Sequence, residues 1–367
     1  MAFTEKYVST TGAGAHTGAD EANALTWAEM LTFGGATSLA GIRFNIKSDA
    51  GYSRTTSADA FTVTAGAPTI AAPMMLRGYS STIGDLESNG RTGSTGALVL
   101  TGFPVVTYTT GNLTLPVYTI VQQCDIASAI AGNAVVAGTN SMFRRSRVRN
   151  THATSAASVA IFSSSNYTTL VDCDISIASN HASAVALDLE RGQAHSCRIS
   201  GADNGGGMGV NAATFSNIVA CQIFDIQKGV DTAGLLCIVE GCSFRNIAGS
   251  NVRVNGGSAV ALINNAAWGT NGASSRWLEV VTAAKSIIQV KNAVGNFGAA
   301  DTNEGDWPVI DEVALSADPF TSSSDLIPNS TSGGGASLKG VGLLAYNDIG
   351  AIQVQAAAAG GARVIGG

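Results

Sequence analysis

The sequence predicts an all-β protein, a right-handed single-stranded parallel β-helix (a solenoid) with a short N-terminal capping helix. Three observations lead to this prediction. Segments of similar pattern recur every 21 to 27 residues through the middle of the chain, small side chains dominate the composition, and an amphipathic segment precedes the first repeat. A solenoid stacks such repeats so that each contacts only its neighbours.

The recurring segments share one buried face. Each contains a small or apolar anchor residue, and most carry a second apolar residue two positions later. Because successive side chains of a strand point to opposite faces, these two residues share the interior and the residue between them points outward. The anchors are Cys124, Ser146, Cys173, Cys197, Cys221, Cys242 and Asn264. The second column is Ile126, Val148, Ile175, Ile199, Ile223, Phe244 and Ala266. A second strand per coil is expected at Val185 with Leu187, Met208 with Val210, Val230, and Val252 with Val254.

Most cysteines fall in the anchor column. Their spacing follows the repeat rather than a cross-linked framework, so we interpret them as small hydrophobic side chains that fill a narrow interior. The expected buried stack is Cys124, Cys173, Cys197, Cys221 and Cys242. No CxxC pattern occurs and no histidine lies close to Cys237 and Cys242 in sequence, so we expect no zinc site, no other metal site and no cofactor.

The outward column between the two buried columns alternates acid and base. Each charge then has an opposite neighbour one coil away, and a slip by one coil would bring like charges together. Exposed pairs of this kind contribute about 0 to 1 kcal/mol each. The predicted ladder is Asp125, Arg147, Asp174, Arg198 and Gln222. For the acidic pair Asp172 and Asp174, the expected partners are Arg145 and Arg147.

Composition and charge argue against several kinds of partner. The chain has 44 glycines, 13% charged residues and a net charge of -6. Binding to nucleic acid or to an anionic membrane needs a basic face, so neither partner is expected. No apolar run approaches the roughly 18 residues needed to span a bilayer. The first residues, MAFTEKYVSTTG, lack the pattern of a secretory signal, so we expect folding in a reducing cytoplasm.

The chain is expected to divide into four parts. Residues 1–50 would hold an N-terminal strand and the capping helix, 51–300 the coils, 301–353 a loop-rich closing segment, and 354–367 an extended tail that contacts another subunit. The helix is predicted over residues 20–33, with Asp20 as its N-cap and Gly34 as its stop. It would cover the first coil, whose backbone would otherwise be open to a neighbouring chain.

Stretches at both ends of the chain carry a family resemblance. They are YVSTTGAGAHTGADEANALTWAEML, IRFNIKSDAGYSR and PMMLRGYSSTIGDLESNGR in the N-terminal part, and NDIGAIQ at 347–353. The first three resemble the N-terminal portion of right-handed β-helix proteins of the pectate-lyase-like superfamily, and the last resembles their closing segment. The superfamily includes polysaccharide lyases, glycoside hydrolases, phage tailspikes and virion proteins without catalysis, so the resemblance implies an architecture rather than one activity.

Few side chains are placed for chemistry. If the protein is an enzyme, Asp188 and Glu190 are the candidate pair, because residues i and i+2 on a strand face lie about 7 Å apart, within the range of glycosidase carboxyl groups. Arg191 follows them, so the alternative interpretation is a solvated turn. The acidic calcium cluster that the resemblance implies for a lyase finds no matching position, and we assign no other catalytic residue. Trp268 and Trp277 are candidate glycan contacts, with packing at coil ends as the alternative.

These observations together predict a virion protein. The absence of an export signal, the resemblance to tailspikes and the apolar tail favour a bacteriophage protein that decorates or cements the capsid. It would fold in the host cytoplasm and act in the virion as a homotrimer, with the major capsid protein or another virion protein as partner. One alternative is a tailspike receptor-binding protein with polysaccharide depolymerase activity, as a hydrolase or a lyase. Another is a non-catalytic glycan-binding adhesin. Both alternatives would bind host surface polysaccharide.

Overall fold

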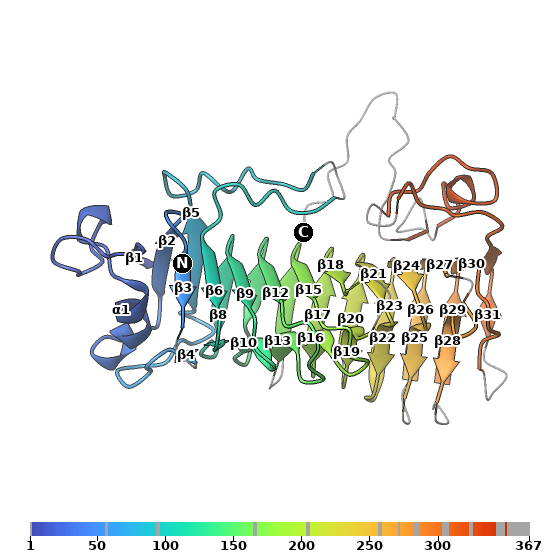
Figure 1. The fold of residues 1–367 in the computed structure, drawn as a ribbon, viewed down its shortest axis with the longest axis horizontal. Helices are drawn as coiled ribbons and strands as arrows, with labels where there is room; N and C mark the ends of the chain where they lie inside the picture. The colour runs from blue at the N-terminus through green and yellow to red at the C-terminus, as the bar shows by residue number, and fades with distance from the viewer. Residues whose placement is uncertain are drawn as a thin grey trace.

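The chain forms one elongated solenoid of parallel β-strands in the computed structural model (Figure 1). The structure describes residues 2–350 except 56–57, 93–95, 164–166, 203–205, 256–258, 271, 282–285, 303–307, 323–325 and 343–348. Within this part of the chain, three parallel sheets run side by side along the solenoid axis. The predicted fold class, an all-β right-handed parallel β-helix with one short helix near the N-terminus, is confirmed. The tail expected at 354–367 lies outside the described residues.

The three sheets are called A, B and C in the order in which a coil passes through them. Sheet A consists, among the described residues, of β1 (Thr4–Val8), β2 (Ile42–Lys47), β5 (Met74–Tyr79), β8 (Thr119–Gln122), β11 (Met142–Arg144), β14 (Thr168–Val171), β17 (Gly192–His195), β20 (Ser216–Val219), β23 (Leu236–Glu240), β26 (Ala259–Ile263), β29 (Ser286–Val290) and β31 (Val309–Ile310). Sheet B consists of β3 (Tyr52–Arg54), β6 (Val105–Tyr108), β9 (Asp125–Ser128), β12 (Arg147–Asn150), β15 (Asp174–Ile177), β18 (Arg198–Ser200), β21 (Gln222–Ile226), β24 (Ser243–Ile247), β27 (Ala266–Trp268), β30 (Ala293–Gly295) and β32 (Val313–Ala314). Sheet C consists of β4 (Asp59–Ala60), β7 (Leu113–Thr114), β10 (Asn133–Ala137), β13 (Val159–Ser163), β16 (Val185–Leu189), β19 (Met208–Ala212), β22 (Lys228–Thr232), β25 (Ser250–Val254) and β28 (Arg276–Val280).

A complete coil contains three strands, one from each sheet, whereas the sequence predicted two. The two predicted strands are those of sheets B and C. From β8 to β23, each strand of sheet A ends two residues before an anchor residue, so these recurring segments span two short strands and the bend between them. For example, β14 ends at Val171 and β15 begins at Asp174. A two-residue bend is too short to contain the run of polar, glycine or proline residues that marks a loop. For this reason the alignment of the repeats did not separate the two strands.

The bend from sheet A to sheet B has the same form in nine coils of the described chain. It has two residues, of which the second occupies the position of the anchor cysteines and the first has a φ between +44° and +59°. A left-handed conformation costs a residue with a side chain on the order of 1 kcal/mol. The bend keeps its backbone hydrogen bond to the next coil, as where the Asp172 N–H donates to His195 O at 2.9 Å. The left-handed residues are Gln123, Arg145, Asp172, Ser196, Ala220, Gly241, Asn264, Lys291 and Asp311.

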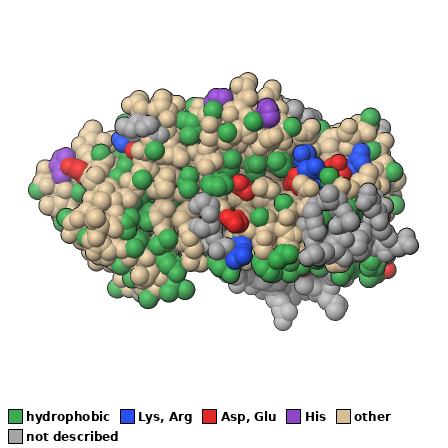
Figure 2. Space-filling model, turned by 90° about the horizontal axis from the view of Figure 1, so that it is seen from below, with side chains coloured by type: hydrophobic (Ala, Val, Ile, Leu, Met, Phe, Trp, Pro, Cys, Tyr) green, Lys and Arg blue, Asp and Glu red, His purple; other side chains and the backbone are tan. Residues whose placement is uncertain are grey.

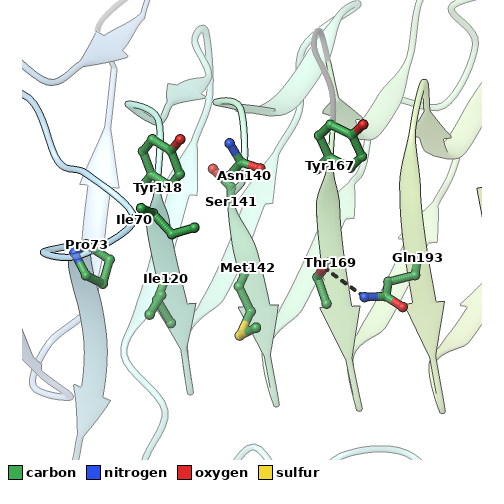
Figure 3. A pocket seen from close by; sticks show the side chains of 10 residues that line it. All are labelled: Ile70, Pro73, Tyr118, Ile120, Asn140, Ser141, Met142, Tyr167, Thr169 and Gln193. Atoms are coloured by element: carbon green, nitrogen blue, oxygen red, sulfur yellow. Dashed lines mark hydrogen bonds between the residues drawn. The ribbon is translucent and has the colours of Figure 1, made fainter. Parts of the chain in front are cut away.

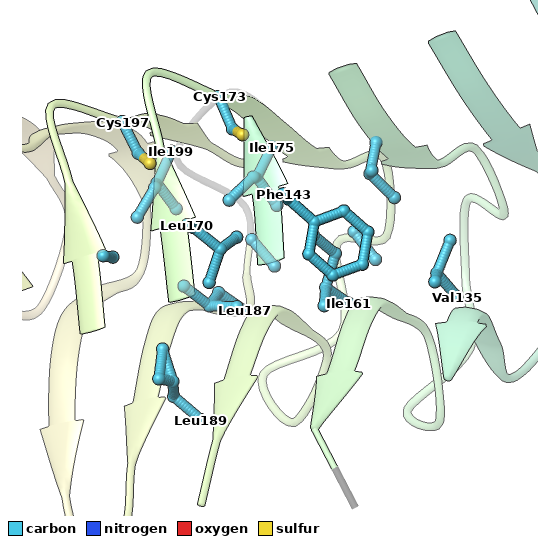
Figure 4. Packing of buried hydrophobic residues seen from close by; sticks show 14 of the residues in the cluster. Val135, Phe143, Ile161, Leu170, Cys173, Ile175, Leu187, Leu189, Cys197 and Ile199 are labelled. Atoms are coloured by element: carbon cyan, nitrogen blue, oxygen red, sulfur yellow. The ribbon is translucent and has the colours of Figure 1, made fainter. Parts of the chain in front are cut away.

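The interior is filled by stacked apolar side chains. Cys173 and Cys197 lie at equivalent positions of adjacent coils, and Ile175 and Ile199 lie beside them (Figure 4). The register places the five cysteines of the expected stack in one column, with Ser146 between the first two. The six cysteines of the chain are all buried and free. They contribute packing to the core without cross-linking it.

The last step of the predicted alignment is wrong by one residue. Strand pairing places Ala267, not Ala266, beside Phe244, so the residue below Cys242 is Asn265. Asn264 occupies the left-handed bend position instead, with a φ of +56°. Asn265 continues the anchor column as a buried polar residue. Its Oδ1 accepts from the Cys242 N–H at 2.9 Å, and its Nδ2 donates to Val239 O at 2.9 Å.

The N-terminal helix is shorter than predicted and begins later. α1 covers Trp27–Thr32, and Thr26 rather than Asp20 is its N-cap. Thr26 forms a capping box with Glu29, in which each side chain accepts from the other residue's backbone N–H. Asp20 precedes a separate 3-10 turn, Glu21–Asn23, and a second 3-10 turn, Phe33–Gly35, follows the helix. The buried face of α1 covers the first coil, where the Trp27 Nε1 donates to Asp59 Oδ2 at 2.9 Å.

Two segments cover the outer face of sheet B. The 80–104 excursion leaves the solenoid after β5 and runs above the strands from β6 to β15 (Figure 1). The closing segment, residues 315–342 with Ile349 and Gly350, lies above the C-terminal strands of the same sheet. A second hydrophobic core forms beneath the closing segment. Its buried members are Phe224, Ala266, Ala293, Leu315, Phe320, Leu326, Leu338 and Ile349. The closing segment also contains the third 3-10 turn, Gly335–Ser337.

Candidate functional site

The predicted charge ladder lies in register on the outer face of sheet B. Arg147 pairs with Asp125 and Asp174 on its two sides, Asp174 pairs with Arg198, and Arg198 with Gln222. Arg147 donates to both carboxylate oxygens of Asp125 at 2.9 and 2.6 Å. The ladder was expected to be exposed, but Asp125 is 1% and Asp174 9% exposed. The 80–104 excursion covers it, and nothing in the repeat pattern revealed that covering.

Arg91 from this excursion reaches two coils of the ladder. Its Nε donates to Asp172 Oδ1 and its Nη1 to Asp174 Oδ1, both at 2.6 Å. Arg145 lies 3.5 Å from Asp172 as predicted, whereas Arg147 is the register neighbour of Asp174 but forms its ion pair with Asp125. Although burial disfavours its charge, Asp174 and Asp172 raise the pKa of Arg91. Sequence reasoning missed Arg91, since more than eighty residues separate it from its partners.

The Asp172 and Asp174 pair is therefore structural. Both oxygens of each carboxylate have a partner, because the Leu98 N–H donates to Asp174 Oδ2 at 2.9 Å and Arg198 lies 4.0 Å from that oxygen. Each carboxylate is held by two arginines, so its oxygens are occupied and neither group is placed to donate a proton to a substrate. The covering excursion also separates them from a large substrate.

A second polar column lies on the outer face of sheet C. The register brings Asp188, Asn211, Asp231, Arg253 and Glu279 into one line over successive coils. Figure 2 views the solenoid from this side and shows charged side chains gathered in small groups on a mostly uncharged face. Arg253 lies between two acids, 2.8 Å from Asp231 and 3.6 Å from Glu279. That part of the column is neutralised internally.

Asp188 has the environment of a general acid. Burial raises its pKa and the nearby Glu190 adds to this effect, while a hydrogen bond from the Asn211 Nδ2 at 2.9 Å opposes it. Glu190 lies beyond the end of β16 and is exposed. Asp231 is two coils away, about 10 Å from Asp188 at the usual strand spacing. This separation is close to the upper limit for the two carboxyl groups of an inverting glycosidase, about 9.5 Å.

The described part of the chain contains no cluster of side chains that could bind a metal ion. No group of three or more His, Cys, Asp or Glu side chains there could hold a metal ion. The calcium cluster implied for a lyase by the family resemblance thus has no counterpart among these residues. No helix in the same part of the chain is long and apolar enough to cross a bilayer.

A shallow groove of about 390 Å³ lies along the outer face of sheet A, at the edge where the chain enters from sheet C (Figure 3). We call it the sheet A groove. It crosses four coils and combines two tyrosines with apolar and amide side chains. Its lining residues are Ile70, Pro73, Tyr118, Ile120, Asn140, Ser141, Met142, Tyr167, Thr169 and Gln193.

The tyrosines of the groove have unusual backbone conformations. Tyr118 and Tyr167 directly precede β8 and β14, and Asn140 lies two residues before the start of β11. The φ values of Tyr118, Asn140 and Tyr167 are +51°, +59° and +72°. For a bulky residue this conformation is an outlier. Tyr167 is 58% exposed, so packing does not explain its position. The sequence does hold a signal, since Tyr-Thr recurs at 118–119 and 167–168, but an alignment anchored on cysteines passes over it.

The two tryptophans differ in position. Trp277 is 1% exposed, packs edge-to-face on Phe244 with ring centroids 5.7 Å apart, and donates from Nε1 to Gln289 Oε1 at 2.8 Å. The structure contradicts the expected glycan contact there, because β28 directs the ring into the core. Trp268 is half-buried and lines a pocket of about 190 Å³ with Arg245, Asn246, Gly269 and Asp318. A glycan contact at Trp268 stays a prediction.

Three parallel sheets, a capped first coil and an uninterrupted solenoid core define a pectate-lyase-like right-handed parallel β-helix. Among solved structures, the chain is similar to the crystal structure of pectate lyase Pel9A, with a TM-score of 0.65 and 12% identity over 96% of this chain and 97% of that one. At this identity the likeness shows the fold alone. No protein-family profile matches the chain, and no curated protein matches it by sequence.

Proposed function

We propose that the protein is a tailspike-like β-helix that binds a polysaccharide in the sheet A groove. One observation carries the proposal: Tyr118 and Tyr167 stand on one edge of an open groove that is lined with apolar and amide side chains (Figure 3). The groove follows the solenoid axis, so it suits a linear polymer better than a compact ligand.

The lining matches the two kinds of surface that a sugar offers. An aromatic ring is a flat apolar face, on which the C–H face of a sugar ring can stack. Asn140 and Gln193 carry amide groups that can donate to and accept from hydroxyl groups. Binding sites of this composition are apolar with a few polar groups that fix orientation.

Binding to polysaccharide tests this proposal directly. Purified protein should bind one or more members of a panel of bacterial capsular polysaccharides and lipopolysaccharides, and Tyr167→Ala should weaken that binding at least tenfold. Val309→Ala is the matched control, because Val309 is 49% exposed on β31 of the same sheet, outside the groove. Equal binding by both variants would refute a site in the groove.

Asp188 supports a second proposal, polysaccharide hydrolysis on sheet C. Its raised pKa and its position beside Asn211, two coils from the carboxyl group of Asp231, are what a general acid requires. Incubation with a bound polysaccharide should then release new reducing ends, and Asp188→Asn should abolish the release without affecting binding. Binding without release in the wild-type protein would leave the alternative of a non-catalytic adhesin.

We also propose assembly into a homotrimer on a bacteriophage particle, with the major capsid protein or another virion protein as partner. The outer face of sheet A supports assembly, because its C-terminal half carries apolar residues in two columns, Ile238, Ala261 and Ile288 in one and Ile263, Val290 and Ile310 in the other. Ile288 and Ile310 are 46% and 48% exposed. Exposed apolar patches on parallel sheets mark contact surfaces.

Sedimentation velocity tests the assembly. The wild-type protein should sediment as a trimer, and Ile288→Asp should dissociate it, while Tyr167→Ala should not. A monomeric wild-type protein would contradict the proposal. The virion location is tested separately, by detecting the protein in purified phage particles at a copy number close to that of the capsid protein.

A further inference from the structure

A row of aromatic side chains extends the tyrosines of the sheet A groove along the solenoid. Tyr118, Tyr167 and Phe215 directly precede Thr119, Thr168 and Ser216, which are stacked in register in sheet A. We call these three residues the aromatic row. They are 49 and 48 residues apart in sequence, which corresponds to two coils for each step. The coils between them contribute Asn140 and Arg191 at the equivalent position.

Strand stacking fixes the spacing of the row. Adjacent strands of a sheet lie about 4.8 Å apart, so consecutive members of the aromatic row are separated by about 9.6 Å along the axis. A sugar residue in an extended, equatorially linked chain advances by about the height of one coil, and successive residues present opposite faces. Every second ring of such a chain would therefore meet an aromatic side chain with the same face.

The row is held in a costly conformation, and two of its three side chains are exposed. The φ values of Tyr118, Tyr167 and Phe215 are +51°, +72° and +53°. Tyr167 and Phe215 are 58% and 52% exposed. A left-handed conformation suits glycine, and it costs a residue with a side chain on the order of 1 kcal/mol. An aromatic side chain exposed to water offers no compensating burial.

The charges beside the row indicate a neutral ligand. Arg191 lies over the Phe215 ring, with its Cζ 5.9 Å from the ring centroid, in a cation–π contact that supports the ring. The exposed Glu190 precedes it in the chain and offsets its charge. The other side chains of the row and groove are uncharged.

From this geometry we infer that the aromatic row binds an extended, equatorially linked polysaccharide of neutral sugars, stacking one face of every second residue. The inference rests on the proposed glycan binding and adds the class of ligand and its repeat. Phe215 lies beyond the groove itself, so the bound chain would extend over five coils, from Tyr118 to Phe215.

The length dependence of binding tests the repeat. The probes are β-1,4-linked glucose oligomers from cellobiose to cellohexaose, titrated by calorimetry. Affinity should increase when the third and the fifth sugar are added, because these additions allow a second and a third ring to stack, and it should change little at the fourth and the sixth. An even increase with every added sugar would overturn the inference.

Substitutions at Phe215 separate ligand binding from folding. Phe215→Gly should weaken binding of cellohexaose about tenfold while leaving cellotriose unaffected, and Phe215→Tyr should retain the binding of both. Glycine also relieves the left-handed strain, so Phe215→Gly should raise the urea midpoint of unfolding rather than lower it. Equal losses for both oligomers, or no loss for either, would overturn the inference.

The outcome also distinguishes this inference from the proposed function. If Tyr167→Ala abolishes binding to a charged capsular polysaccharide and no neutral oligomer binds, the groove binds glycans and the neutral two-residue repeat is wrong. If no polysaccharide of either kind binds the wild-type protein, both proposals fail.

Discussion

Replacing Arg91 with methionine removes the side chain that holds the 80–104 excursion on sheet B. The guanidinium donates to Asp172, in the bend before β15, and to Asp174, the first residue of β15. Its Nη2 also donates to Cys173 O at 3.3 Å and to Ser196 O at 3.1 Å. Methionine keeps an unbranched apolar stem of similar length but provides no donor. The substitution therefore leaves two acids beneath the excursion without their shared partner.

The magnitude follows from the burial of the three groups. Removal of one partner from a buried ion pair costs about 3 to 5 kcal/mol, because the remaining charge is left buried. The side chains of Arg91 and Asp174 are only 7% and 11% exposed, but Asp172 is 25% exposed and both acids keep a second arginine nearby. We therefore take the lower end, about 3 kcal/mol, which corresponds to a factor of about 100 in the opening of the excursion.

Hydrogen exchange on residues 80–92 and 96–104 measures that opening. In Arg91→Met, the protected amides of the excursion, such as the Leu98 N–H on Asp174, should exchange about 100 times faster, while the core strands of sheet C keep their protection. Arg144→Met is the matched control, because Arg144 is exposed on the outer face of β11. Exchange within about threefold of wild type in Arg91→Met would refute the assigned role.

Three further predictions concern the column on sheet C and the core. Burial raises the pKa of Asp188, so the contribution of this group to stability is complete below its ordinary pKa of 3.8 and is lost as the pH rises through the raised value. The urea midpoint of Asp188→Asn should therefore increase relative to that of the wild-type protein between about pH 3 and pH 7. A difference between the two midpoints that stays constant with pH would contradict this. Burial raises the pKa of Cys124 and Cys237 to about 12, so iodoacetamide at about pH 8 should leave both unmodified in the native protein and label them in urea; rapid native labelling would disprove their burial. Asn265→Ala should lower the free energy of unfolding by about 3 kcal/mol, because the Cys242 N–H and Val239 O lose their partners. Asn217→Ala is the control and should lower it by less than about 0.5 kcal/mol, because Asn217 is exposed. Equal effects of the two substitutions would rule out this explanation.

The architecture was predictable because a solenoid repeats one buried pattern. Small anchors and apolar residues two positions later, such as Cys173 with Ile175, recur often enough to identify sheet B from the sequence. The short strands of sheet A were not predicted, because a two-residue bend joins them to sheet B and eight of the nine bends lack the glycine or proline that usually separates strands. The left-handed residue of that bend includes Arg145, Ala220 and Lys291, so residue type gives no signal.

A local sequence pattern could not predict which segments cover the outer face of sheet B. Arg91 and Asp174 are 83 residues apart, and their contact depends on where an irregular excursion lies on a finished surface. The aromatic row is different, since its spacing of two coils was visible in the sequence. It was missed because tyrosines just before a strand belong to neither buried column.

The constant bend between sheets A and B has a consequence for how such a chain can change. Its length never varies over nine coils of the described chain, whereas the connection from sheet B to sheet C varies from one residue, Gln227, to eight, 151–158. An added residue at the bend would exchange the inner and outer faces of the sheet B strand that follows, while an added residue on the B-to-C flank only enlarges a loop. New surface features can thus accumulate along one flank of the rod, and foreign loops could be grafted there coil by coil without altering its pitch.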